Sequence, residues 1–89
     1  MFDLDQQWQV HPRVALRPER FGALLYHFNT RKLSFLKNPT LLKIVQSLGE
    51  QPTARAALVA ADVPAAQYDT YRAALNTLAT SDMIVQTGK

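Results

Sequence analysis

The sequence FGALLYHFNTRKLSFLK, at residues 21–37, contains two apolar runs separated by a short polar break. The runs are Phe21–Phe28 and Leu33–Leu36, and the break is Asn29–Lys32. Two such runs joined by a few polar residues predict a β-hairpin. Asn38 and Pro39 follow directly, as a good N-cap and a good first helical residue, and they predict that a helical half begins there.

The second strand of this hairpin is bordered by basic residues. Arg31 and Lys32 precede it and Lys37 follows it. A strand of this kind, left at a sheet edge, can take up another peptide through main-chain hydrogen bonds. The positive charges would favour an acidic peptide, mainly by speeding encounter and fixing register.

The two faces of this strand differ in character. Leu33 and Phe35 share one face, and Ser34 and Leu36 share the other, because side chains alternate along a strand. We expect Leu33 and Phe35 to shape pockets for an added peptide. The pattern does not say which face meets the helices, since a shift of one residue exchanges them.

Upstream of the hairpin, the alternation of apolar and polar residues from Trp8 to Leu16 predicts a first strand. Pro12 interrupts this alternation, which indicates an edge, a bulge or a gap. Arg17–Arg20, with Pro18 in second place, predicts a turn.

Downstream, three helices and a short strand are predicted. The first helix stops at Gly49, Thr53 caps the second, and the third spans Ala65–Thr80. Met83–Val85 is a short apolar run that can form a terminal strand. Strands followed by helices indicate an α+β fold. We expect a small three-stranded antiparallel sheet (strands within residues 6–37) and a three-helix, winged helix-turn-helix-like unit (39–80), in a single domain of residues 1–89.

Composition limits the possible functions. The chain of 89 residues has no cysteine, so disulfides and thiolate metal sites are excluded. We expect a cytoplasmic protein without membrane contact, because the N-terminus lacks the pattern of a signal peptide and no apolar window is long enough to cross a bilayer. The net charge is +3, and residues 1–48 hold seven Lys and Arg against three Asp and Glu. This basic half is either a site for an acidic partner or a solvated surface.

The sequence does not suggest an enzyme. The two histidines, His11 and His27, lie in different predicted strands without metal-ligand spacing, and we expect both to be structural. The three glycines are too far apart for a phosphate-binding loop. We therefore expect no catalytic residues, no metal and no cofactor.

A winged helix-turn-helix shape would also permit nucleic-acid binding. The recognition helix would be Ala65–Thr80, which holds one base, Arg72, and one acid, Asp69. Because phosphate neutralisation dominates such binding, a helix without net charge is a poor match for a polyanion. Nucleic-acid binding is therefore the alternative interpretation, and we expect no nucleic-acid partner.

Two interpretations are open for the tyrosines of this helix. Tyr68 and Tyr71 share a stripe with Leu75, which is typical of core residues. They could instead form the wall of a groove between the helix and the Leu33–Leu36 strand, with Arg72 at its polar rim.

The run from Val14 to Leu48, VALRPERFGALLYHFNTRKLSFLKNPTLLKIVQSL, resembles the peptide chaperones of mycofactocin biosynthesis. These chaperones belong to the pyrroloquinoline-quinone chaperone (PqqD-like) group of precursor recognition domains for ribosomally made, modified peptides. The most specific part is RPE-x-FGALLYHF at Arg17–Phe28, followed by TRKLSFL at Thr30–Leu36. The remainder, Gln51–Lys89, resembles the family only in pattern.

The resemblance implies a function. Members bind a precursor peptide and present it to a radical S-adenosylmethionine (SAM) maturase, and they carry no active site or iron–sulfur cluster. Related domains bind an acidic leader segment as an extra strand on the third strand, beside the third helix. Carried onto this sequence, the third strand is Lys32–Lys37 and the helix is Ala65–Thr80. The expected peptide-binding residues are Arg31, Lys32, Leu33, Ser34, Phe35, Leu36, Lys37, Tyr68, Tyr71, Arg72 and Leu75. The oligomeric state, monomer or homodimer, is left open.

Overall fold

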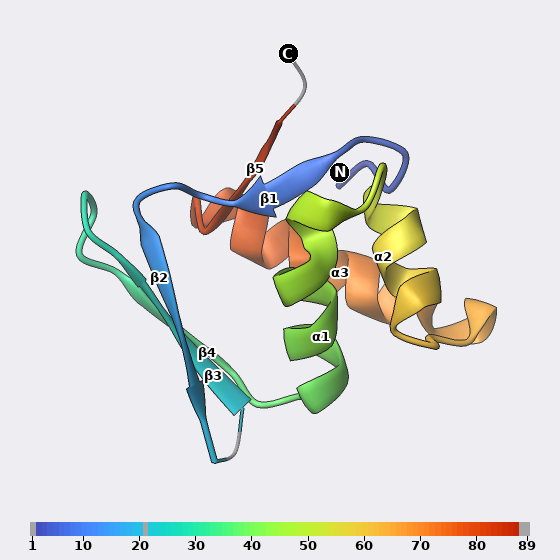
Figure 1. The fold of residues 1–89 in the computed structure, drawn as a ribbon, viewed down its shortest axis with the longest axis horizontal. Coiled ribbons are helices and arrows are strands. Elements are labelled where there is room, and N and C mark those ends of the chain that lie inside the picture. The colour runs from blue at the N-terminus through green and yellow to red at the C-terminus, as the bar shows by residue number, and fades with distance from the viewer. Residues whose placement is uncertain (1, 21, 88–89) are drawn as a thin grey trace.

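The computed structural model describes residues 2–20 and 22–87, and it has the α+β architecture predicted from the sequence. The helices lie on one side of a three-stranded sheet, and a second, two-stranded sheet lies near both chain ends (Figure 1). The strands are β1 (Trp8–Val10), β2 (Val14–Glu19), β3 (Gly22–His27), β4 (Leu33–Leu36) and β5 (Ile84–Gln86). The helices are α1 (Pro39–Ser47), α2 (Ala54–Ala60) and α3 (Tyr68–Thr80), with 3₁₀ turns at η1 (Leu48–Glu50) and η2 (Ala65–Gln67). None of the helices in these ranges has the length and apolarity needed to cross a membrane.

The three-stranded antiparallel sheet has the order β2-β3-β4, so β3 is central and β4 is an edge strand. The predicted hairpin is the β3–β4 pair. The prediction of one strand over Trp8–Leu16 is wrong, because β1 pairs with β5 and only β2 joins β3. The gap at Pro12 therefore separates two sheets. The turn predicted at Arg17–Arg20 is also displaced, since β2 continues to Glu19 and Pro18 lies within it.

Alternation gives the three-stranded sheet an inner and an outer face. Ala23, Leu25 and His27 are buried on the inner face, against the helices. On β4 the inner face carries Ser34 and Leu36, and Leu36 is buried. We call the opposite side the outer face, which is formed by the side chains of Ala15, Arg17, Leu24, Tyr26, Leu33 and Phe35.

The first two helices begin where the sequence predicted, because their caps are local. The third was predicted from Ala65, but α3 begins at Tyr68, because Ala65–Gln67 form the 3₁₀ turn η2. The Asn38 side chain accepts hydrogen bonds from the N–H groups of Thr40 and Leu41, at 2.8 and 3.3 Å. The Thr53 hydroxyl accepts from the N–H of Ala56 at 3.1 Å. The buried side of α1 faces the core with the stripe read from the sequence: Leu41, Ile44 and Val45, with Leu48 just beyond. The arrangement is compatible with a winged helix-turn-helix unit.

The N-terminal segment completes the core, which the sequence did not indicate. Phe2 and Leu4 are buried, and Phe2 stacks on Trp8 with ring centroids 4.2 Å apart. The guanidinium of Arg55 pairs with the carboxylate of Asp5 at 2.9 Å. The hydrogen bond from Arg55, together with its charge, holds the pKa of Asp5 below the ordinary value. The segment is thus fastened to the start of α2.

Candidate functional site

The open edge of β4 offers main-chain hydrogen-bonding groups. The N–H of His27 donates to the C=O of Lys32 at 3.0 Å, so these two residues form a hydrogen-bonded pair between β3 and the residue before β4. In an antiparallel ladder, bonded and non-bonded pairs alternate. The N–H and C=O groups of Leu33 and Phe35 therefore point away from β3, toward the free edge.

The other edge of the sheet, at β2, offers fewer donors. Phe28 N–H donates to the C=O of Arg13 at 2.8 Å, so the even-numbered residues of β2 direct their main-chain groups outward. Of these, Val14 already donates its N–H to His11 C=O at 2.9 Å, and Pro18 has no N–H to donate. Proline is a common means of protecting an edge strand. Of the two edges, β4 is the one suited to strand addition.

A groove lies beside the β4 edge. It has a volume of about 350 Å³, and it is formed between the inner side of β4, the start of α1 and one face of α3. Its lining is mostly apolar, and consists of Ser34, Phe35, Leu36, Leu41, Ala74, Thr77 and Leu78. An extended peptide on β4 would direct every second side chain toward this groove, because side chains alternate along a strand.

The structure brings only part of the expected helix residues to this groove. Leu75 is completely buried, so its side chain supports α3 from within the core. Tyr71 is 9% exposed, and its hydroxyl accepts a hydrogen bond from the Asn38 side chain at 3.0 Å. Tyr68 is half-buried against the core. The core interpretation of these tyrosines therefore fits better than the groove interpretation.

Four groove residues were absent from the sequence prediction: Leu41, Ala74, Thr77 and Leu78. The last three stand at spacings of three and four on α3, so they share one helix face. That spacing was visible in the sequence. The aromatic stripe was more conspicuous, and only the placement of α3 shows which side of the helix borders β4.

The basic residues around β4 lie at its two ends. Arg31 and Lys32 are exposed in the turn before β4, where Arg31 adopts a left-handed φ of 64° and donates its N–H to His27 C=O at 2.7 Å. Lys37 is exposed after β4 and lines a second hollow together with Arg20. Both ends of the edge therefore present positive charge.

Gly22 allows β3 to begin close against the end of β4. Its φ is 151°, and a Cβ atom at this position would lie 1.7 Å from the carbonyl oxygen of Leu36. Any other residue would push the two strands apart. The glycine thus sets the path of β4 just before α1.

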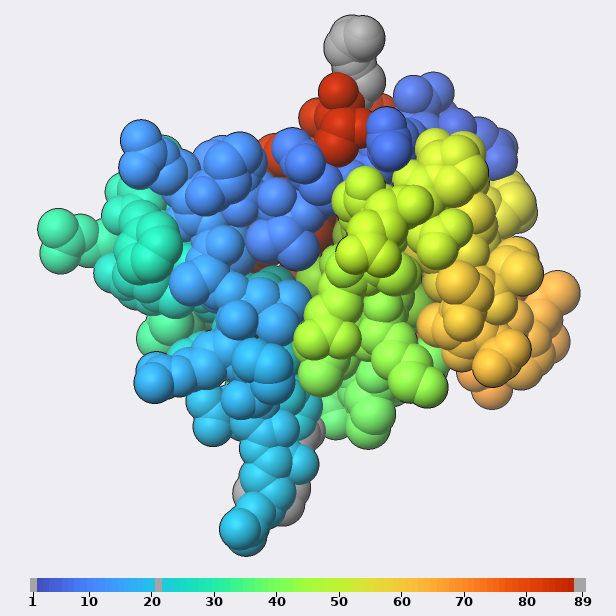
Figure 2. Space-filling model, viewed as in Figure 1, coloured from blue at the N-terminus to red at the C-terminus, as the bar shows by residue number. Residues whose placement is uncertain are grey.

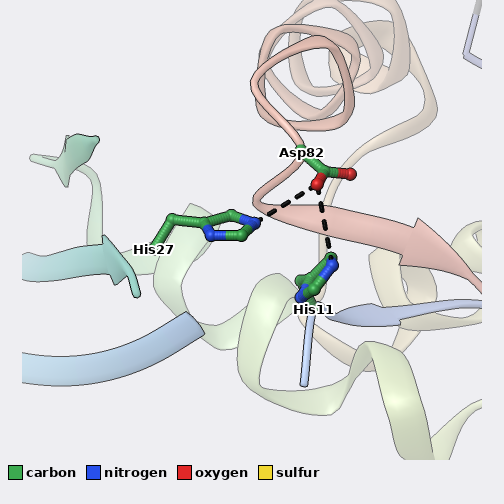
Figure 3. A group of neighbouring side chains, drawn as sticks. All are labelled: His11, His27 and Asp82. Carbon is green, nitrogen blue, oxygen red and sulfur yellow. Dashed lines mark hydrogen bonds and ion pairs between the residues drawn. The ribbon is translucent and has the colours of Figure 1, made fainter. Parts of the chain in front are cut away.

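A cluster of His11, His27 and Asp82 fastens the β3–β4 turn to the end of α3 (Figure 3). The Nε2 atom of buried His27 lies 3.2 Å from Oδ2 of Asp82, and Nε2 of His11 lies 3.6 Å from the same oxygen. Asp82 adopts a left-handed φ of 64°, which Asp tolerates better than most residues. Three segments far apart in the chain meet at one carboxylate.

The hydrogen bonds to Nδ1 of the two histidines decide whether this cluster could hold a metal ion. The N–H of Arg13 donates to Nδ1 of His11 at 2.9 Å, and those of Asn29 and Thr30 donate to Nδ1 of His27 at 3.2 and 3.3 Å. With Nδ1 of each ring accepting from the main chain, Nε2 is left to donate toward Asp82, at hydrogen-bond distance for His27 and farther away for His11. A metal ion would need lone pairs on those Nε2 atoms, so the cluster fits a hydrogen-bonded clasp and not a metal centre.

Comparison with known proteins connects this geometry to a family. The model of the peptide chaperone MftB family matches residues 7–85, which include the β4 edge and the groove. The chain belongs to this family. Peptide chaperones MftB from Mycobacterium tuberculosis and Mycolicibacterium smegmatis are each 56% identical to it over 84 residues. The match covers 94% of this chain and 77% and 82% of those relatives. No solved structure matches the chain.

Membership of the peptide chaperone MftB family identifies the protein as a chaperone with a non-catalytic role. The charges on α3 do not support the alternative of nucleic-acid binding. Arg72 is 34% exposed at its side chain and pairs with Asp69 at 3.4 Å, so the one base of the helix is already partly neutralised.

Proposed function

We propose that the protein binds the ribosomally made mycofactocin precursor peptide by strand addition to β4 and presents it to a radical SAM maturase. The observation that carries the proposal is an open edge strand beside an apolar groove in a member of the peptide chaperone MftB family. The peptide would become a fourth strand of the sheet, next to β4 and along α3.

Main-chain bonds would provide the affinity that does not depend on the peptide's sequence. Leu33 and Phe35 each offer an outward N–H and C=O, and each hydrogen bond contributes about 0.5–1.5 kcal/mol net. Such a strand accepts any peptide that can extend, apart from proline at the wrong position. Selectivity then has to come from side chains.

The groove supports selectivity for aliphatic side chains. Its floor is Leu36, Leu41 and Leu78, and Ala74 leaves room because it is small. Burying one aliphatic side chain there contributes roughly 1.5–3 kcal/mol. The exposed Arg31, Lys32 and Lys37 support an acidic peptide, each exposed pair adding about 0.2–1 kcal/mol.

The proposal is tested by titrating the ¹⁵N-labelled protein with a synthetic acidic leader peptide of the precursor. We expect the amide signals of Leu33–Lys37 and of the α3 residues Ala74, Thr77 and Leu78 to shift. Duplex DNA at low salt serves as the parallel arm. Unmoved β4 signals at saturating peptide would contradict the site, and tight DNA binding would favour the alternative function.

A pair of tryptophan variants tests the groove itself. Thr77 is exposed on α3 and lines the groove, whereas the neighbouring Asn76 is exposed but does not line it. Thr77→Trp should fill the groove and weaken peptide binding roughly tenfold to hundredfold, which corresponds to losing one buried aliphatic side chain. Asn76→Trp is the matched control and should bind like the wild type. Isothermal titration calorimetry measures both, and equal affinities would show that the groove is not used.

A further inference from the structure

The outer face of the sheet is apolar and uncovered. Leu33 is 62% exposed, Phe35 is 45% exposed, and Phe28, just beyond β3 on the same side, is 56% exposed. Among the described residues, the other large hydrophobic side chain with such exposure is Val59 on α2. Leu24 and Tyr26 fill the centre of this face. The rings of Tyr26 and Phe28 pack edge to face, with centroids 5.2 Å apart. A contiguous exposed apolar patch of this kind marks an interaction surface.

Positive charge surrounds the patch. By strand alternation Arg17 projects on the same side as the apolar residues. Arg13, whose C=O accepts from Phe28 N–H, and Lys37, which lines a hollow together with Phe35, continue this alternation just beyond the strand ends. Glu19 also lies on that side and pairs with Arg17 at 3.8 Å. Three bases against one acid leave a positive border around aromatic and aliphatic side chains. Aromatic residues and arginine are the types enriched where proteins bind each other.

The face adjoins the proposed peptide site and shares Phe35 with it, because Phe35 also lines the groove. The helices and the groove lie on the inner side of the sheet, and Figure 1 shows the opposite side free of them. Both ends of the sheet project beyond the helical body in Figure 2, as light-blue and green lobes. An occupant of the outer face would therefore lie next to a peptide bound at β4, and the two would share only the neighbourhood of Phe35.

We propose that the outer face docks a folded protein partner whose own surface is apolar and bordered by carboxylates. This inference rests on the proposed function in one respect, since the partner is taken to be the maturase that receives the peptide. A second copy of the chain would not fit, because a twofold contact would place the same basic border against itself. An anionic membrane is a poorer match, since three cations contribute only about 1 kcal/mol each and the face is a sheet without an inserting helix.

Two variants test the apolar centre against a matched control. Phe28→Asp places an acid in the patch, and Val59→Asp makes the same change on α2, at a residue of similar exposure. The probe is the purified radical SAM maturase, and its affinity is measured by calorimetry. We expect Phe28→Asp to weaken maturase binding at least tenfold and Val59→Asp to leave it unchanged. Equal affinity of the two variants, whether high or low, would overturn the proposal.

A charge reversal tests the border. Arg13→Glu should lower maturase affinity several-fold, whereas Lys43→Glu, on the exposed side of α1, should not, although both change the net charge equally. The proposal would be contradicted if Lys43→Glu lowered maturase affinity more than Arg13→Glu, or if neither variant changed it.

Two further measurements distinguish failure of the proposed function from failure of the docking proposal. Leader-peptide affinity is measured on the same samples and should change less than twofold in Phe28→Asp. If the leader peptide does not bind the wild type while the maturase does, the proposed function fails and the docking face stands. If anionic phosphatidylserine vesicles, and not the maturase, shift the amide signals of Leu24–Phe28, the surface is a membrane contact and the proposal falls.

Discussion

At the scale of single residues, Asp82 connects the peptide-binding strand to the helical half. Its carboxylate receives the Nε2–H of His27, while Nδ1 of that ring accepts main-chain hydrogen bonds within the β3–β4 turn. The ring therefore organises the turn on one side and holds α3 on the other. His27 is 1% exposed, so an unpaired Nε2–H could not turn to water.

This clasp predicts how two substitutions of Asp82 differ. Asp82→Ala removes the acceptor and places a residue with poor left-handed tolerance at φ 64°, so the free energy of unfolding should fall by about 1–3 kcal/mol. Asp82→Asn keeps an acceptor oxygen and tolerates that φ, and should cost less than about 1 kcal/mol. Urea denaturation measures both changes. Equal losses in the two variants would show that the hydrogen bond to His27 is not what stabilises the turn.

At the scale of the element, β4 differs from β2 in what its edge can donate. Pro18 and the bond from Val14 to His11 remove donors from the β2 edge, while the outward groups of Leu33 and Phe35 stay available. The prediction of the β3–β4 hairpin succeeded because turn, alternation and helix cap are encoded within a few residues. The pairing of β1 with β5 joins residues more than 70 positions apart, and no local pattern specifies it.

The edge predicts a difference between two variants of one residue. Phe35→Ala removes the ring and keeps the outward N–H, whereas Phe35→Pro removes both. Proline is tolerated at an edge position whose N–H faces outward, so both variants should fold. The peptide should bind the proline variant about 2- to 13-fold more weakly than the alanine variant, which is the value of one hydrogen bond. Fluorescence anisotropy measures the affinities, and ¹⁵N spectra check the fold. Identical affinities would mean that the peptide does not pair with β4.

The candidate site was predictable only in part. The strand residues Ser34 and Leu36 could be found from the hairpin, although their face could not, because alternation gives two faces and only packing selects one. On α3 the aromatic stripe indicated Tyr68 and Tyr71, yet these pack toward the core. Which helix residues border β4 depends on the rotation of α3 about its axis, and this is set by contacts with distant segments.

At the scale of the whole molecule, charge is unevenly distributed. Residues 49–89 hold three Lys and Arg against four Asp and Glu, so the excess of bases in residues 1–48 accounts for the positive field. The β4 edge lies in that half. Because exposed charges interact over a Debye length of about 10 Å at 0.1 M salt, the field should act mainly on encounter and not on the bound state.

Ionic strength should therefore change the association rate of an acidic leader peptide more than its dissociation rate. Raising the salt from about 0.05 to 0.5 M should slow association several-fold, and the double substitution Arg31→Glu with Lys37→Glu should reduce this dependence. Stopped-flow fluorescence measures both rates. Lys43→Glu on α1, compared with Arg31→Glu alone, is the control, because both make the same change in net charge. A salt effect confined to dissociation would argue against steering by the basic half.

The alternation along β4 has a consequence for how two ligands would influence each other. A peptide strand beside β4 would point half of its side chains into the groove and the other half onto the outer face, next to Leu33 and Phe35. The outer face would then widen by one strand spacing, about 4.8 Å. A protein docked there would contact the bound peptide as well as the chaperone. Such a protein would discriminate loaded from empty chaperone, and by thermodynamic reciprocity it would retain the peptide more tightly by the same factor. Binding of the peptide and of the docked protein to this sheet would then be positively cooperative.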